Sequence, residues 1–325
     1  MFARGLLAGA MLWAAGAGAA GTGWVVEPDF KNASAAKQIS GASCPNTAVR
    51  QDWCIVVNDE KKYIQFFELD ARRITPVARM RVMAKTDGTG RKQDEPDLEA
   101  IAREGRYVYV TGSHGAPRRG KPVQPSRFHV FRFPVDAKTG RPGFEVSRKK
   151  LTNEIETSTR LGPAIAEVPA LTQLAGKQLS ENGVTIEGLG ARDGQLFFGL
   201  RTPVDQDGAF VLETSADALF SNKTFELTSH RVQLGDGYGI RAIERFRDAF
   251  LLLAGTGYGP EMQAVIWIWK PGHAAVRVAE PEVPTGWKAE GLMLLSDDAD
   301  RGVRVLVFFD GQKNGSPVAF TLPIQ

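Results

Sequence analysis

Ile186-Glu187-Gly188-Leu189 and Ala289-Glu290-Gly291-Leu292 are two copies of a short motif that decides the fold of this chain. The motif joins an apolar residue, a usually charged residue, a Gly or Ala, and an apolar or small residue. Three more copies are Ile39-Ser40-Gly41-Ala42, Leu98-Glu99-Ala100-Ile101 and Ile240-Arg241-Ala242-Ile243. Most of the spacings between copies are close to 50, and internal repeats of about 50 residues are typical of a β-propeller or a similar repeat array.

Each motif is followed by short runs of β-branched and aromatic residues, which favour strands over helices. The expected strands lie at 54–57, 63–67, 107–110, 128–131, 196–198, 210–212, 250–253, 265–269, 303–309 and 318–320. Two to four short antiparallel strands per repeat is the content of a propeller blade. The sequence therefore predicts an all-β fold, with one β-propeller domain over residues 21–325 and five visible blade repeats.

Residues 136–185 depart from this rhythm, because the segment is polar, contains three prolines and lacks an alternating pattern. It is either a long excursion from the second blade, with a short helix near 171–179, or a sixth, degenerate blade. We favour the excursion, which gives a propeller of five blades; the alternative gives six. Ahead of the first motif, Trp24-Val25-Val26 is expected to form a strand that completes the last blade and closes the ring.

The net charge of +3 is nearly balanced, whereas a nucleic-acid binder gathers basic residues on one face. The two short basic runs, Arg118-Arg119-Gly120-Lys121 and Arg148-Lys149-Lys150, are interpreted as solvated loops. The Gly-rich stretches 235–239 and 255–259 precede no expected helix, so they do not predict a phosphate-binding loop. The motifs of serine hydrolases and zinc proteases are absent from the sequence.

Residues 1–20 have the pattern of a secretory signal peptide, with Arg4, an apolar stretch over 5–15 and small residues at 17–19. That stretch is too short for a transmembrane helix, and the rest of the sequence contains no apolar span of about 20 residues. We expect a periplasmic or secreted protein without a membrane span. Cys44 and Cys54 are expected to form a disulfide; neither a CxxC spacing nor a nearby His favours a redox or metal pair.

Polar residues also follow the motifs at regular distances. Ser113, which precedes His114, follows Glu99 at the same offset at which Arg201 follows Glu187. Asp59 and Asp310 follow their motifs at longer and nearly equal offsets, in repeats that carry visible insertions. If each motif marks the inner strand of a blade, these residues reach equivalent places at one end of the central channel. The residues expected there are Glu99, Glu187, Glu290, Arg241, Arg201, Ser113, His114, Asp59 and Asp310.

Two interpretations of this charged ring stay open. In the first, ion pairs such as Glu187–Arg201 or Glu290–Arg241 brace neighbouring strands. In the second, the ring is a ligand site, because carboxylates that face one channel repel each other unless a cation, an Arg or protons intervene. Oxygen-rich clusters suit Ca²⁺ or Mg²⁺, and the arginines suit a phosphate or carboxylate.

On these motifs the chain resembles a family of uncharacterised exported bacterial propellers, a domain of unknown function. The resemblance covers nearly the whole mature chain and rests on 97–102, 110–114, 186–189, 198–203, 239–241 and 289–292. That family is similar to propellers with esterase-like phytase activity. The resemblance implies an acidic channel that acts on phosphoesters with a metal.

Two functional hypotheses follow. In the first, the protein is a hydrolase of phosphoesters: Glu99, Glu187 and Glu290 hold a divalent ion that activates water. Arg201 and Arg241 stabilise the developing negative charge, His114 is the acid or base, and Asp59, Ser113 and Asp310 contact the substrate. In the second, the protein is a non-catalytic propeller of the cell envelope that binds a small polar ligand or a protein partner. The sequence leaves substrate, catalysis and oligomeric state open.

Overall fold

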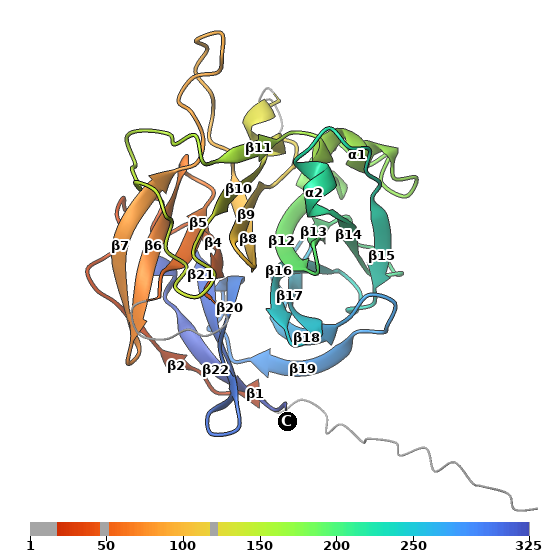
Figure 1. The fold of residues 1–325 in the computed structure, drawn as a ribbon. Coiled ribbons are helices and arrows are strands. Elements are labelled where there is room, and N and C mark those ends of the chain that lie inside the picture. Colours follow the sequence, from red (N-terminus) through yellow and green to blue (C-terminus); the bar gives the residue numbers. More distant parts are fainter. Residues whose placement is uncertain (1–17, 46–51, 118–122, 325) are drawn as a thin grey trace, which may run out of the picture.

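Five sheets surround a central axis as the blades of a β-propeller (Figure 1). The structure is a computed structural model, and it describes residues 18–45, 52–117 and 123–324. The prediction of an all-β propeller is confirmed, and the ring has five blades. Residues 1–17 of the predicted signal peptide lie outside the described residues. Among the described residues, no helix has the length and apolarity needed to cross a membrane.

The innermost strand of each blade carries the sequence motif. Blade 1 contains β4 (Ile39–Ser43), β5 (Cys54–Asn58), β6 (Tyr63–Asp70) and β7 (Arg73–Arg81). Blade 2 contains β8 (Leu98–Glu104), β9 (Tyr107–Gly112), β10 (Val130–Pro134) and β11 (Glu156–Ser158). Blade 3 contains β12 (Thr185–Arg192), β13 (Gln195–Thr202), β14 (Ala209–Ser215) and β15 (Thr228–Val232). Blade 4 contains β16 (Tyr238–Phe246), β17 (Ala249–Thr256), β18 (Val265–Trp269) and β19 (Val276–Pro281). Blade 5 contains β20 (Lys288–Asp298), β21 (Gly302–Asp310) and β22 (Val318–Leu322).

The N-terminal segment runs along the outer edges of three blades. β1 (Gly18–Ala19) pairs with β19, β2 (Thr22–Gly23) pairs with β22, and β3 (Val25–Val26) pairs with β7. The ring is thus closed by Thr22–Gly23, which gives blade 5 its fourth strand. The prediction that Trp24–Val26 closes the ring is wrong, because Val25–Val26 passes on to the edge of blade 1.

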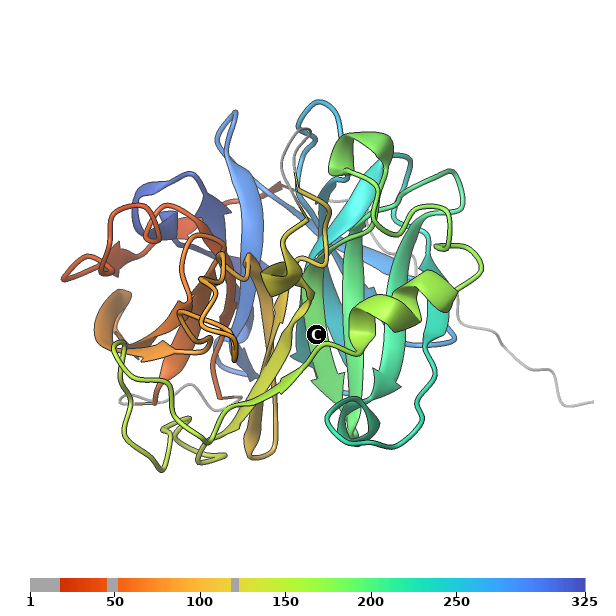
Figure 2. The same cartoon turned by 90° about the horizontal axis from the view of Figure 1, so that it is seen from above.

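The segment 136–185 is an excursion from blade 2, as predicted, and not a sixth blade. It supplies β11, the outer strand of that blade, and continues into the short helix α1 (Leu161–Glu167) and the 3₁₀ turn η2 (Leu179–Glu181). The helix therefore lies before the position predicted for it, near 171. Further short helical elements are η1 (Pro125–Phe128), α2 (Ala216–Leu219) and η3 (Lys313–Gly315). Figure 2, turned by 90° from the view of Figure 1, shows the ring edge-on, with loops gathered on its two faces.

Hydrophobic side chains fill the spaces between neighbouring blades. Each of the five clusters in the described residues joins two adjacent blades, as Phe197 of blade 3 and Phe250 of blade 4 do with ring centroids 4.7 Å apart. Both faces of every sheet are covered in this way. The inner strands are therefore buried on both sides, and most of their side chains face other blades rather than the axis.

The motif is the sequence of a β-bulge. In each inner strand the pairing register shifts between the first and third motif positions, at Ile39/Gly41, Leu98/Ala100, Ile186/Gly188, Ile240/Ala242 and Ala289/Gly291. The second position is the extra residue in every case. In a regular strand the side chain of this residue would point away from one face of the sheet. The bulge turns it, so that the residue can line the channel.

At two of the third motif positions, Gly41 and Gly188, a glycine is required because the neighbouring blade approaches closely there. A Cβ on Gly188 would lie 2.8 Å from Cγ1 of Ile243 in the next blade, and one on Gly41 would lie 3.1 Å from the carbonyl oxygen of Glu99. Larger side chains at these positions would push the blades apart.

Candidate functional site

The five bulged residues come together at one end of the channel. These residues are Ser40, Glu99, Glu187, Arg241 and Glu290, and several of them border a space of only about 10 Å³. Such a space holds no more than one water molecule. Leu189 and Ile243 border both this space and a second small one at the other end of the inner strands. Apolar side chains thus separate the two ends of the channel.

Arg241 is the centre of the charged ring. Its Nη1 donates to Oε2 of Glu187 at 2.8 Å and to Oε1 of Glu290 at 3.0 Å, while its side chain is only 1% exposed. Arg201, on β13, donates from Nη1 to the other oxygen of Glu187 at 2.7 Å and from Nε to the carbonyl of Gly257. Two guanidinium groups therefore hold one carboxylate, as the ion-pair interpretation of the sequence expects.

These contacts divide the glutamates into two kinds. Burial alone would raise the pKa of Glu187, but Arg241 and Arg201 outweigh it and lower this pKa below its usual value. Burial raises the pKa of Glu290 well above its usual value, and the nearby Glu187 carboxylate adds to this although Arg241 opposes it. The two guanidinium groups thus favour the ionised form of Glu187, whereas burial favours the neutral form of Glu290.

Glu99 faces carboxylates on both sides. Burial, and then Asp97, Glu187, Glu290 and Asp59, raise the pKa of Glu99 well above its usual value. Within the described part of the chain, no hydrogen bond or ion pair holds this carboxyl group. Glu99 therefore connects the guanidinium side of the ring with a second, acidic side.

The regular offset found in the sequence is a structural equivalence. The residue paired with the first motif position is Asn58, Gly112, Leu200, Ala254 or Phe309. The next residues are Asp59, Ser113, Arg201, Gly255 and Asp310, so they follow the inner strands at matching places. Asp310 and Asp59 lie near the ring. The charges of Glu187 and Arg241 affect the pKa of Asp310, and the charge of Asp310 affects the pKa of Asp59.

An acidic pocket opens beside this ring between blades 1 and 2. Its volume is about 330 Å³, and its walls are Gln38, Asp59, Glu60, Glu95, Asp97, Pro117, Gln124 and Arg127. Arg127 pairs with Asp97 at 3.1 Å. Burial, followed by Asp97, Asp310 and Glu60, raises the pKa of Asp59 to about 7. We call this site the acidic pocket.

Loops build the acidic pocket, which is why sequence reasoning missed most of it. Asp59 and Glu60 follow β5, Asp97 precedes β8, and Arg127 lies on η1. Asp97 stands directly before the motif residue Leu98, and it adopts a left-handed backbone with φ of 53°. Asp59 was expected at this end of the channel from its offset, and the position of Asp97 directly before a motif was a further signal.

His114 does not join the ring. Its ring packs edge-on against Phe128, and a Cβ on Gly162 of α1 would lie 3.7 Å from its Nδ1. The residue is 3% exposed, and both ring nitrogens lack hydrogen-bond partners among the described residues. Burial lowers the pKa of His114 to about 3, with a smaller effect of His129. Its neighbour Ser113 is also buried and accepts a hydrogen bond from the Gly115 N–H.

The carboxylates do not gather around an open metal position. Within residues 18–45, 52–117 and 123–324, no group of three or more His, Cys, Asp or Glu side chains is placed to hold a metal ion. The Arg241 guanidinium occupies the space between Glu187 and Glu290 instead. The metal role of Glu99, Glu187 and Glu290 stays a prediction, and these contacts do not favour it.

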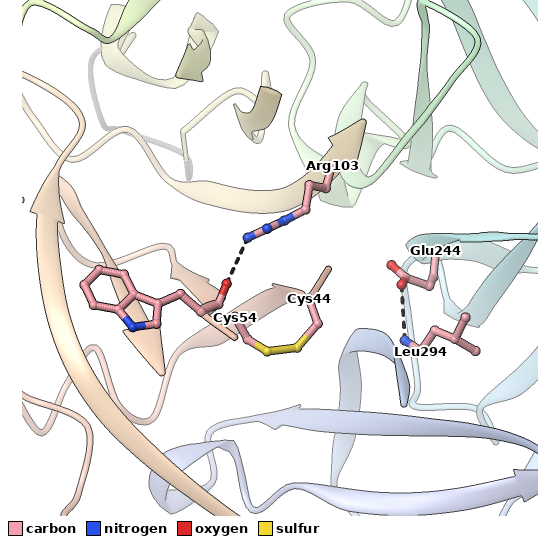
Figure 3. Close-up of a disulfide and its surroundings, with 6 residues drawn as sticks. Cys44, Cys54, Arg103, Glu244 and Leu294 are labelled. Atoms are coloured by element: carbon pink, nitrogen blue, oxygen red, sulfur yellow. Dashed lines mark hydrogen bonds between the residues drawn. A yellow bond between two sulfur atoms is a disulfide. The ribbon is translucent and has the colours of Figure 1, made fainter. Parts of the chain in front are cut away.

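A second polar cluster lies at the opposite end of the inner strands (Figure 3). The Cys44–Cys54 disulfide is present there, as predicted. Arg103 donates from Nη2 to the carbonyl of Trp53 at 3.0 Å, and Glu244 accepts from the Leu294 N–H at 3.2 Å. Burial lowers the pKa of Arg103 to about 10 and raises the pKa of Glu244 to about 8. Apart from the cysteine pair, no sequence pattern pointed to this cluster.

Comparisons with solved structures are weak in sequence. An N-acetylgalactosamine deacetylase from F. plautii, in complex with blood group B trisaccharide, shares 10% identity with a TM-score of 0.45, over 92% of each chain. A luciferin-regenerating enzyme shares 9% identity with a TM-score of 0.42, over 88% of this chain and 91% of that one. Arabinanase Arb43A from Bacillus subtilis shares 10% identity with a TM-score of 0.39, over 89% of this chain and 94% of that one. Similarity at this level does not transfer an activity.

No curated protein matches the sequence. A family model described as "Protein of unknown function (DUF3616)" matches residues 44–130 and 143–316. This match reaches into all five blades and includes four of the five bulged motif residues. The chain therefore belongs to the DUF3616 family.

Proposed function

We propose that this protein is an exported, ligand-binding propeller that holds the cationic group of a small molecule in the acidic pocket. The observation that carries the proposal is the buried carboxyl group of Asp59. Its Oδ1 is buried without a hydrogen-bond partner in the described residues. The charges of Asp97, Asp310 and Glu60 all repel the ionised carboxylate and raise its pKa. A positive group beside Asp59 would relieve this repulsion and favour the ionised carboxylates.

The size of the pocket supports a small ligand. A volume of about 330 Å³ is at the lower end of the range of about 300–1,000 Å³ found for small-molecule sites. The narrow channel below it, with about 10 Å³ of free space, would admit only a water or part of a ligand. The ligand would therefore sit at the mouth of the channel.

Two features support export to the periplasm or the medium. The Cys44–Cys54 disulfide fits an extracellular protein, because disulfides persist in oxidising compartments. Residues 1–20 have the pattern of a signal peptide. Expression of the full chain, with fractionation and N-terminal sequencing, tests this part of the proposal; an uncleaved protein retained in the cytoplasm contradicts it.

Calorimetry with hexylamine tests cation binding, with hexanol as the uncharged control. We expect hexylamine to bind and hexanol not to bind. Because the pKa of Asp59 is about 7, amine binding should release a proton, and affinity should rise between pH 6 and pH 8. Titrations in two buffers of different ionisation enthalpy measure this proton directly.

Asp59→Asn is the decisive variant, and Asp236→Asn, on the exposed connection between β15 and β16, is its matched control. Asp59→Asn should remove the pH dependence and weaken hexylamine binding on the order of tenfold, as expected for a lost charged contact. Asp236→Asn should bind as the wild type does. The absence of amine binding to the wild type, or equal binding by Asp59→Asn, contradicts the proposal.

A metal-assisted phosphoester hydrolase, similar to the esterase-like phytase propellers, is the second candidate. One observation favours it: the pKa is lowered at Glu187 and raised at Glu99 and Glu290, and carboxyl groups whose pKa values are pushed apart serve as base and acid. This function needs a divalent ion near these glutamates, although Arg241 holds two of them. Phosphate release from a panel of phosphoesters with Ca²⁺, Mg²⁺ or Mn²⁺ tests it. No release with any ion, or equal release by Glu187→Ala, rules it out.

A further inference from the structure

Arg241 presents two buried guanidinium nitrogens that make no hydrogen bond in the described part of the chain. Its Nη1 is shared by Glu187 and Glu290, whereas Nε and Nη2 have no hydrogen-bond partner there. Nε and Nη2 form one edge of the planar guanidinium, and this edge can bind a carboxylate through two parallel hydrogen bonds. Buried donors without partners cost free energy, so this edge indicates a missing ligand group.

The surroundings of this edge suit a carboxylate. Oε1 of Glu261 lies 3.8 Å from Nη2, which is near enough for an ion pair and too far for a hydrogen bond. The Glu261 side chain is 31% exposed, on a loop that Thr256 fastens through the Pro260 carbonyl and the Met262 N–H. On the other side, residue 255 is a glycine, and a Cβ there would lie only 3.4 Å from Nε. Glu261 thus stands where a ligand carboxylate would bind, without making its hydrogen bonds.

The groups around Arg241 leave one edge of its guanidinium open to an anion. Arg201 and Arg241 bring two positive charges, and Glu187 is the ionised carboxylate between them. Burial and the charge of Glu187 favour the neutral form of Glu290. The two guanidinium groups thus share Glu187, and the Nε–Nη2 edge of Arg241 stays open to an anion, either Glu261 or a ligand.

We infer that the ligand is a zwitterion: its ammonium group lies in the acidic pocket, and its carboxylate takes the Nε–Nη2 edge of Arg241 in place of Glu261. The inference rests on the proposed function and adds the second charge of the ligand. Glu99 links the two positions. Its pKa is raised by the charges of Asp59 and Asp97 on the acidic side and by those of Glu187 and Glu290 on the guanidinium side. The two charges of the ligand would then lie on either side of Glu99.

Calorimetry with unbranched ω-amino acids tests this inference. The series is 4-aminobutyrate, 6-aminohexanoate and 8-aminooctanoate, each compared with the amine of the same chain length, and hexanoate serves as the anion control. We expect at least one amino acid to bind about tenfold tighter than its matched amine, the gain typical of a good charged contact. If every amino acid binds no better than its amine, the inference is overturned, while amine binding alone leaves the proposed function standing. If neither amines nor amino acids bind, both fail.

Variants of Glu261 test the replacement step separately. Glu261→Gln removes the competing charge, so it should raise the affinity for the best amino acid by about three- to tenfold and leave the affinity for the matched amine unchanged. Glu282→Gln, an exposed glutamate near blade 4, is the control and should change neither. Equal effects of Glu261→Gln on amino acid and amine would overturn the role assigned to the Arg241 edge. Thermal unfolding of each variant shows that it is folded.

Discussion

Replacing Glu244 with glutamine should stabilise this protein, and more strongly as the pH rises. Glu244 lies on β16 and is 8% exposed. Burial raises the pKa of its carboxyl group to about 8, although the Leu294 N–H and the charge of Arg103 oppose this. The group is therefore protonated in the folded protein at neutral pH and ionised in the unfolded chain. Glutamine keeps the acceptor oxygen that the Leu294 N–H needs and cannot ionise.

The sign and size of the effect follow from proton linkage. The folded state retains a proton that the unfolded state loses above its pKa of 4.5. The stability contributed by this carboxyl is thus full below pH 4.5 and is lost as the pH rises towards 8. At pH 7 the loss is about 3 kcal/mol, and it grows to between 4 and 5 kcal/mol, roughly, at pH 8 and above. Glu244→Gln should match the wild type near pH 4.5 and exceed it by these amounts at higher pH.

Urea unfolding at pH 5 and pH 8 measures this difference. The shift of the unfolding midpoint gives the change in free energy, provided that the slope with urea is the same for both proteins. Glu282→Gln, on the exposed surface, controls for the general effect of removing a carboxylate. The reasoning is refuted if Glu244→Gln changes stability equally at both pH values, or if it is less stable than the wild type at pH 8.

Three further results are expected. When the pH falls from 6.5 to 5, His114→Asn should lose about 2 kcal/mol less stability than the wild type, because the buried histidine, with a pKa of about 3, stays neutral while the unfolded chain takes up a proton. Thermal unfolding at both pH values measures this difference. An unchanged acid sensitivity in the variant contradicts the prediction. Replacing Cys44 and Cys54 together with serine should cost about 2–3 kcal/mol for the short loop that they close, measured by urea unfolding with and without a reductant; wild-type stability in the double variant argues against the disulfide. Arg241→Met should cost about 3–5 kcal/mol because it leaves Glu290 without its guanidinium partner and Glu187 with Arg201 alone, and Glu187→Gln in the same chain should recover part of the loss. A double variant no more stable than Arg241→Met would show that Glu187 does not depend on this guanidinium.

The fold was predictable because one local feature recurs. A bulge needs a small residue where neighbouring inner strands touch and a polar one where the side chain turns to the axis, so the motif is visible in the sequence at each blade. The closing strand was not predictable in the same way. Thr22–Gly23 is only two residues long and contains a glycine, a residue depleted in strands, so only its pairing with β22 makes it a strand. Val25–Val26 has the stronger propensity, but it pairs with β7.

The charged ring was predictable in membership, and only in part in its chemistry. Periodicity placed Glu99, Glu187, Arg241 and Glu290 together, but spacing along the chain does not tell which oxygen meets which nitrogen. That Arg241 bridges two glutamates is a matter of three-dimensional distance. His114 follows the regular offset by one residue, and its backbone φ of 52° and its contact with Phe128 belong to a different environment. The acidic pocket depends on loops that the motif does not describe.

A crystal structure of the protein with hexylamine tests the central claim most directly. The account predicts the ammonium group within hydrogen-bond distance of the Asp59 carboxylate, inside the pocket bounded by Glu60, Glu95 and Asp97. An amine bound at another surface, or an acidic pocket without amine at concentrations that saturate binding in solution, would contradict it.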